Sequence, residues 1–94
     1  MKNKKSQNDG AIQISVIMPV FNGQSYLREA IDSVLNQTFM DFEFIIVNDG
    51  STDKSLEIIK SFDDQRIRLI NQKNSGIVSS LNKGIKVSNG KFIA

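Results

Sequence analysis

One segment of the sequence, Asn48–Asp53, carries the residue types best suited to chemistry. It follows an apolar run and brings together carboxylates, hydroxyls and a glycine. Its simplest interpretation is a tight turn and helix cap, with Ser51 and Asp53 at the start of a helix. A chemical interpretation makes Asp49 a carboxylate at the end of a strand, beside the amides that start a helix. Such a carboxylate can accept a hydrogen bond from a nucleobase or a sugar, and it is poorly placed to accept phosphate.

Three other loop chemistries need residues that the sequence does not supply. A calcium loop requires Gly and Glu where the chain has Lys54 and Lys60. A P-loop requires Gly-Lys-Ser or Gly-Lys-Thr at the start of a helix, and neither triplet occurs. A dinucleotide site requires three glycines after the first strand, whereas Phe21–Gln24 supplies only Gly23.

The segment Pro19–Asn22 closes an apolar run near the start of the chain. Because Pro fixes φ and has no N–H donor, one interpretation is simply the end of a strand. The functional interpretation is that this backbone and the ring of Phe21 form one wall of a flat pocket for a heterocycle. Asn74–Gly76 is a weaker signal, and its simplest interpretation is a turn and a cap for the following helix.

The composition narrows the possible chemistry. Ninety-four residues, 39% hydrophobic and 23% charged, fit one globular domain with a modest core. The chain has no Cys and no His, which excludes disulfides, thiolate metal sites, cysteine nucleophiles and a Ser-His-Asp triad. A net charge of +2 gives no reason to expect nucleic acid as a partner. Since no apolar stretch approaches the roughly 20 residues of a membrane-spanning helix, we expect a soluble, cytoplasmic protein.

The elements that must position these residues alternate between strands and helices. Residues 1–11 form a tail that we expect to be disordered. The four runs typical of strands are Ile14–Val20, Phe42–Val47, Ile67–Ile70 and Lys91–Ala94. This alternation predicts an α/β fold of parallel strands joined by right-handed βαβ units. Ligands bind beyond the carboxyl ends of such strands, where the loops Val20–Ser25, Asn48–Asp53 and Asn71–Gly76 lie.

Three segments between these runs have apolar residues at helical spacing. The first covers Gln24–Phe39, with Asn22 or Ser25 available as its cap, and the third is predicted to end at Asn89–Gly90. The apolar residues that mark the helices are Leu27, Ala30, Ile31, Val34 and Leu35, then Leu56, Ile59 and Phe62, then Ile77, Val78, Leu81 and Ile85. The phenylalanines assigned to the core are Phe39, Phe42, Phe44 and Phe62.

Several of these motifs occur together in a fixed order. They are Ile14–Asn22, Val34–Phe39, Phe44–Asp53, Asn74–Gly76, Leu81–Ile85 and Asn89–Ala94. The ordered set strongly resembles the amino-terminal half of the family 2 glycosyltransferases, over nearly the whole chain after residue 12. It is far more specific than any single motif, and it favours the functional interpretation over a simple turn and cap.

The resemblance implies a GT-A fold, which is a Rossmann-like arrangement of three layers. The expected sheet has four mostly parallel strands in the order 3-2-1-4, with three helices. Residues 12–94 are then the incomplete amino-terminal, nucleotide-sugar-binding part of a glycosyltransferase domain. The nucleotide-binding residues implied by the resemblance are Pro19, Val20, Phe21, Asn22, Asp49 and Asn74.

The resemblance also implies a role for each of these positions. Pro19–Asn22 line the base and ribose, mostly through backbone atoms. Asp49 accepts the N3–H of uracil or a similar base, and Asn74 lies near the base on the other side. The donor is then a nucleotide sugar, most simply a UDP-sugar, and the acceptor is a glycan or a lipid-linked molecule. A full-length enzyme of this kind is expected in the cytoplasm or at the inner face of the membrane.

Two departures from the family pattern limit what this chain can do. Leu81 stands where members often carry Arg, so a phosphate or base contact from that position is not expected. The Asp-x-Asp motif that holds a divalent metal, Mg²⁺ or Mn²⁺, follows the strand that starts at Lys91, and the sequence ends before it. No metal ligand and no catalytic residue is therefore assigned in this chain, and we predict that it does not transfer sugar by itself.

Two alternatives stay open. A non-catalytic α/β module could use the open edge beyond the fourth strand to pair with another chain, for example as a homodimer. An unrelated receiver-like or phosphatase-like domain is less favoured, since the phosphatase version needs a nucleophilic Asp where the chain has Val47.

Overall fold

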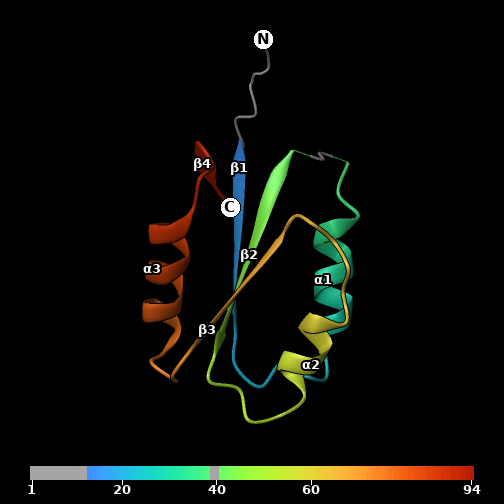
Figure 1. Cartoon of the computed structure of the whole chain (residues 1–94), viewed down its shortest axis with the longest axis vertical. Coiled ribbons are helices and arrows are strands. Elements are labelled where there is room, and N and C mark those ends of the chain that lie inside the picture. The colour runs from blue at the N-terminus through green and yellow to red at the C-terminus, as the bar shows by residue number, and fades with distance from the viewer. Residues whose placement is uncertain (1–12, 39–40) are drawn as a thin grey trace.

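Strands and helices alternate along residues 13–38 and 41–94, the part of the chain that the computed structural model describes (Figure 1). The elements are β1 (Ile14–Val20), α1 (Leu27–Leu35), β2 (Phe42–Asp49), α2 (Ser55–Lys60), β3 (Ile67–Gln72), α3 (Ile77–Val87) and β4 (Phe92–Ile93). The predicted tail, residues 1–11, and the predicted core residue Phe39 lie outside the described residues. The bounds of β1 agree with those predicted from the sequence.

All four strands belong to one parallel sheet with the order β3-β2-β1-β4. This confirms the predicted α/β class and the strand order 3-2-1-4 that the resemblance implied. At the carboxyl ends of the strands, Val20 pairs with Asn48, and Asn48 pairs with Asn71. The loops that follow β1, β2 and β3 therefore leave the sheet at the same edge.

Helices cover both faces of the sheet, with α1 and α2 on one face and α3 on the other (Figure 1). Every residue of β2 is buried, which explains why its sequence is almost continuously apolar. The core lies on the face of α1 and α2, where Leu27, Ile31 and Ile59 pack with Phe42 and Phe44. Two of the predicted core phenylalanines are thus confirmed, and the third described one, Phe62, packs half-buried against this cluster.

The other face is built differently. α3 approaches the sheet through Ser80 and Gly84, which are its buried residues. A side chain at Gly84 would bring its Cβ to 2.5 Å from the side chain of Ile17 in β1, so this close packing requires glycine. The apolar residues that marked the third helix in the sequence are exposed: Ile77, Val78, Leu81 and Ile85.

The structure corrects five predicted details. β2 and β3 each extend two residues beyond their predicted ends, to Asp49 and Gln72. α1 is shorter than predicted, and its N-cap residue is Tyr26, which makes no side-chain cap; neither predicted candidate, Asn22 or Ser25, stands at that position. α3 ends at Val87, before Asn89–Gly90. Within the described ranges even the longest helix, α3 with 11 residues, is too short and too polar to cross a bilayer.

Candidate functional site

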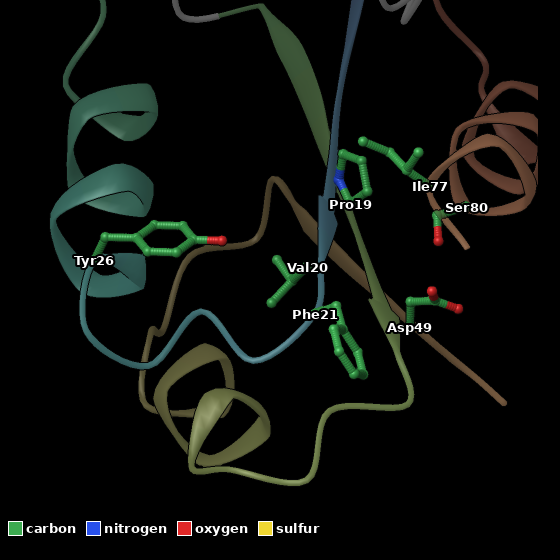
Figure 2. Close-up of a pocket in the computed structure, with 7 residues that line it drawn as sticks. All are labelled: Pro19, Val20, Phe21, Tyr26, Asp49, Ile77 and Ser80. Atoms are coloured by element: carbon green, nitrogen blue, oxygen red, sulfur yellow. The ribbon is translucent and has the colours of Figure 1, made fainter. Parts of the chain in front are cut away.

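A pocket of about 220 Å³ opens at the carboxyl ends of β1 and β2 (Figure 2). Four residues predicted from the sequence line it together with three that were not predicted. The seven residues are Pro19, Val20, Phe21, Tyr26, Asp49, Ile77 and Ser80. The parallel topology could have indicated Ile77 and Ser80, because it places the start of the third helix at the same edge. No signal in the sequence distinguished Tyr26 from other exposed aromatic residues.

The register of the sheet brings Phe21 and Asp49 side by side. Val20 pairs with Asn48, so Phe21, the first residue after β1, and Asp49, the last residue of β2, lie at the same level. Figure 2 shows the two side chains beside each other at the ends of β1 and β2. Phe21 is 50% exposed, whereas Asp49 is 3% exposed. An open aromatic ring thus adjoins a buried carboxylate.

The carboxylate of Asp49 accepts four hydrogen bonds, all from residues 72–76. The Oδ1 atom accepts from Gln72 Nε2 and from the Ser75 N–H, both at 2.8 Å. The Oδ2 atom accepts from the Gly76 N–H at 2.9 Å and from Asn74 Nδ2 at 3.1 Å. The amides beside Asp49 therefore belong to the loop that precedes α3, and not to the helix that follows β2.

These contacts fix the charge of the site. The hydrogen bond from Gln72, followed by those from the backbone of Ser75 and Gly76, holds the pKa of Asp49 below its ordinary value, although burial opposes this. Asp49 is therefore ionised at neutral pH. A carboxylate has about four lone-pair positions, and the four protein donors to Asp49 occupy all of them.

Asn74 braces Asp49 from outside the pocket. Its Nδ2 donates to the Asp49 backbone oxygen at 3.0 Å as well as to the carboxylate. Gly50 makes this approach possible, because a Cβ at this position would lie 2.6 Å from the Asn74 nitrogen, and its φ of +72° favours glycine. Asn74 is exposed and is not among the residues that line the pocket.

Asn22, the remaining predicted site residue, also does not line the pocket. Its side chain turns toward the loop after β2, where Oδ1 accepts the Thr52 N–H at 2.8 Å and the Asp53 N–H at 3.3 Å. In return, the Asn22 N–H donates to Ser51 Oγ at 3.0 Å. Asn22 and Asn74 therefore lie outside the pocket that the other four predicted residues line, although Asn74 is hydrogen-bonded to Asp49.

Further hydrogen bonds join the loops after β1 and β2. The Gly23 N–H donates to Ser55 Oγ, and the Gln24 N–H donates to the carboxylate of Asp53. The Lys54 N–H donates back to the side chain of Gln24. Asp53 also accepts the Ser55 N–H at 2.9 Å, close to its predicted place at the start of a helix. The polar residues that follow Asp49 thus serve mainly to connect the loop after β2 to the loop after β1.

A second buried carboxylate, Glu43, lies at the opposite end of β2 and was not singled out from the sequence. It is 4% exposed and accepts hydrogen bonds from Ser15 Oγ at 2.6 Å, from the Asn89 N–H and from Arg68 at 3.3 Å. Burial alone would raise its pKa, but these donors outweigh burial and hold the pKa of Glu43 below the ordinary value. A charged residue inside an apolar strand was the available signal, because buried charges need partners.

The described residues do not fit a divalent metal. No group of three or more acidic, His or Cys residues that could hold a metal ion occurs in residues 13–38 and 41–94. Asp49, the carboxylate in the pocket, already directs its oxygens toward four N–H donors. We therefore assign no metal ligand among these residues.

Comparison with known proteins identifies relatives. Residues 15–94 match the family described as glycosyl transferase family 2. The chain is 43% identical to glycosyltransferase GlyA of Streptococcus pneumoniae, over 86% of this chain and 12% of that protein. It is 45% identical to the uncharacterized glycosyltransferase EpsJ of Bacillus subtilis, over 85% of this chain and 24% of that protein. The chain thus spans about an eighth to a quarter of the length of these curated relatives.

Two solved structures share the fold. TarS (residues 1–349) of S. aureus superposes with a TM-score of 0.79 at 30% identity, over 86% of this chain and 26% of that one. A mannosyltransferase from Pyrobaculum calidifontis, in complex with GDP-Man and Mn²⁺, also gives a TM-score of 0.79, at 20% identity over 88% of this chain and 26% of that one. These matches confirm the GT-A fold that the resemblance implied.

Proposed function

The chain belongs to glycosyl transferase family 2, and we propose that it forms the donor-nucleotide half of a glycosyltransferase domain, with the base bound at Phe21 and Asp49. The observation that carries this proposal is their adjacency: an exposed aromatic ring and an ionised carboxylate share one pocket at the carboxyl ends of two parallel strands. Pockets at this edge are where open α/β sheets bind ligands.

The pocket offers a nucleobase both apolar surface and one strong acceptor. Pro19, Val20 and Phe21 supply apolar surface, and Ile77 of α3 lies beside Pro19 (Figure 2). A flat heterocycle packs well against such surfaces. Asp49 would then accept the N3–H of uracil or the corresponding N–H groups of guanine. A base without a donor at that position gains no such bond, which provides selectivity.

Binding of a base to Asp49 requires an exchange of hydrogen bonds. Each carboxylate oxygen already accepts two, so a base N–H must take the place of one protein donor. The contact from Asn74 Nδ2 is the longest of the four, and it comes from an exposed side chain, whereas Ser75 and Gly76 donate from the backbone. We infer that Asn74 yields to the base, which brings the base near Asn74 as the resemblance implied.

The reaction of the whole protein is proposed from its relatives. A nucleotide-sugar donor, most simply a UDP-sugar, would transfer its sugar to a glycan or lipid-linked acceptor in the cytoplasm or at the inner face of the membrane. The structural neighbour with GDP-Man and Mn²⁺ supports a nucleotide-sugar donor and a divalent metal, Mg²⁺ or Mn²⁺. The described residues provide no ligand set for that metal, so we propose that this chain alone does not transfer sugar.

Calorimetric titration of the chain with UDP and GDP tests the proposal. We expect weak binding by the unmodified chain and at least about tenfold weaker binding by Asp49→Asn, because the variant loses a charged acceptor. Asp32→Asn is the control, since it removes the same charge from an exposed position of α1. Absence of binding at millimolar UDP and GDP, or equal affinities for the Asp49 variant and its control, would contradict the proposal.

A second candidate function, pairing of two chains through the sheet edge, is favoured by β4. This strand lies at one end of the sheet, and its residues Phe92 and Ile93 are 65% and 47% exposed. Sedimentation velocity decides this case. A dimer that Phe92→Asp dissociates would support edge pairing, and a monomer at high concentration would argue against it.

A further inference from the structure

We propose that Asn22 is a positioning residue: it clamps the loop after β1 to the loop after β2 and thereby holds Phe21 in the pocket. The clamp consists of the hydrogen bonds that Asn22 makes with residues 51–53. This inference rests on the proposed function, because the pocket that Phe21 lines is the proposed site of the base.

The backbone of Asn22 has an unusual conformation that makes the clamp possible. Among the residues that the structure describes, it is the one non-glycine residue with a positive φ, at +52°. Asn adopts this left-handed conformation more readily than most residues. The turn allows Phe21 to line the pocket while the next side chain, that of Asn22, bonds to the loop after β2.

The side chain of Asn22 accepts hydrogen bonds from backbone amides in the loop that precedes α2. The N–H groups of Thr52 and Asp53 both donate to Oδ1, at 2.8 and 3.3 Å, and the Thr52 hydroxyl lies 3.4 Å from the same atom. In the other direction, the N–H of Asn22 donates to Ser51 Oγ. The contact is therefore reciprocal, and each loop satisfies polar groups of the other.

Phe21 lies between two fixed points. On one side, sheet pairing fixes Val20 against Asn48. On the other side, the clamp fixes Asn22, and the Gly23 N–H is bonded to Ser55 Oγ at 2.9 Å. If the bonds of Asn22 are removed, the chain between Val20 and Gly23 loses its attachment to the loop after β2. The half-exposed ring of Phe21 then samples several positions, and less of the population is ready to bind a base.

Two substitutions at position 22 separate the acceptor from the backbone conformation. Asn22→Gly keeps access to a positive φ but removes Oδ1. Asn22→Asp keeps an oxygen that can accept the same two N–H groups. We expect UDP affinity to fall about fivefold or more in the glycine variant and to stay within about twofold in the aspartate variant. Ser51→Ala removes only the acceptor of the Asn22 N–H and replaces the glycine variant if that protein does not fold.

A double-mutant cycle distinguishes positioning of Phe21 from a general loss of structure. If Asn22 acts through Phe21, Phe21→Ala combined with Asn22→Gly binds UDP no more weakly than Phe21→Ala alone. Faster hydrogen exchange of the Thr52 amide in Asn22→Gly reports loss of the clamp independently of ligand. Additive losses of affinity in the double variant would overturn the inference.

The same titrations separate failure of this inference from failure of the proposed function. If the unmodified chain binds UDP and Asn22→Gly binds it equally well, the clamp does not position Phe21, and only the inference is overturned. If the unmodified chain binds neither UDP nor GDP, the proposed function fails, and the role of Asn22 in binding fails with it.

Discussion

The helices α1 and α3 lie on opposite faces of one sheet and present their apolar residues in opposite ways. In α1, Leu27 and Ile31 are fully buried in the core. In α3, Val78 and Ile85 are 67% and 48% exposed, and the helix faces the sheet with Ser80 and Gly84. Apolar spacing therefore identified both helices, but it did not indicate which side of the helix meets the sheet.

The two helices are consequently held in place by different forces. Apolar burial stabilises the packing of α1. α3 buries few apolar side chains, and two carboxylates of β2 hold its ends instead. Asp49 bonds the loop before α3, and Glu43 bonds the Asn89 N–H just after it. Both carboxylates belong to the alternate residues of β2 that face α3, so one strand fixes both ends of the helix.

The largest expected difference lies between matched isoleucines of the two helices. Ile31→Ala should lower the free energy of unfolding by about 3 kcal/mol, because it leaves a cavity in the core. Ile85→Ala, the control on the exposed side of α3, should change it by less than about 0.5 kcal/mol. Urea unfolding followed by circular dichroism measures both, and similar losses would show that the two helices pack alike.

Removal of the carboxylate beyond the end of α3 should have the next largest effect. Glu43→Ala leaves the Asn89 N–H without its acceptor and should cost about 2 kcal/mol of unfolding free energy. Glu43→Gln keeps the shape and one oxygen, so its loss should be smaller. Hydrogen exchange at Asn89 and Gly90 should accelerate in both variants. Unchanged protection in Glu43→Ala would contradict the view that this residue anchors α3.

Acid should weaken the anchoring of α3 more than the packing of α1. Folding lowers the pKa values of Glu43 and Asp49. At a pH between the folded-state and unfolded-state pKa values, the unfolded chain therefore binds more protons than the folded chain, and acid favours unfolding. Their contribution is present above about pH 4, the ordinary range of these carboxyls, and is lost as the pH falls through the lower folded-state values. Unfolding measured from pH 7 to pH 2.5 should show this loss, and Glu43→Gln should reduce its size. A pH-independent stability would contradict the anchoring by carboxylates.

The smallest expected effect concerns the exposed partner of Glu43. Arg68 is 44% exposed on its side chain, and its contact with Glu43 is 3.3 Å long, so Arg68→Ala should cost about 0.5 kcal/mol. Because solvent screens this pair, added salt should reduce the difference further. Arg68 Nη1 also donates to the Val87 backbone oxygen at 2.8 Å, so a loss equal to that of Glu43→Ala would mean that the contacts of Arg68 hold the end of α3 as strongly as the buried hydrogen bonds of Glu43 do.

Much of the architecture could be predicted from the sequence. The carboxyl end of β1 could be predicted from nearby turn-forming residues, because Pro19 and Asn22–Gly23 favour the end of a strand. Parallel topology then predicts that the loops containing Phe21 and Asp49 meet at one edge, as they do. The strand order, by contrast, came from the resemblance, because no local pattern states which strands are neighbours.

Side-chain directions at the site could not be predicted in the same way. The four donors to Asp49 come from the last residue of β3 and the loop after it, which are close in space and 23 or more residues away in sequence. The left-handed conformation of Asn22, which turns its amide toward residues 51–53, likewise depends on the neighbouring loop. Such contacts are tertiary, so residue spacing along one segment does not reveal them.

Side-chain and backbone NMR spectra of the chain during titration with UDP test most directly whether the ends of β1 and β2 form one base site. We expect the shifts to concentrate at Phe21, at the amides of Ser75 and Gly76 beside Asp49, and at the side-chain amide of Asn74, which gives up its hydrogen bond to the base. Residues around Glu43, at the other end of β2, should not respond. Shifts confined to the outer side of α3, or shifts at Phe21 without any at the donors to Asp49, would contradict this expectation.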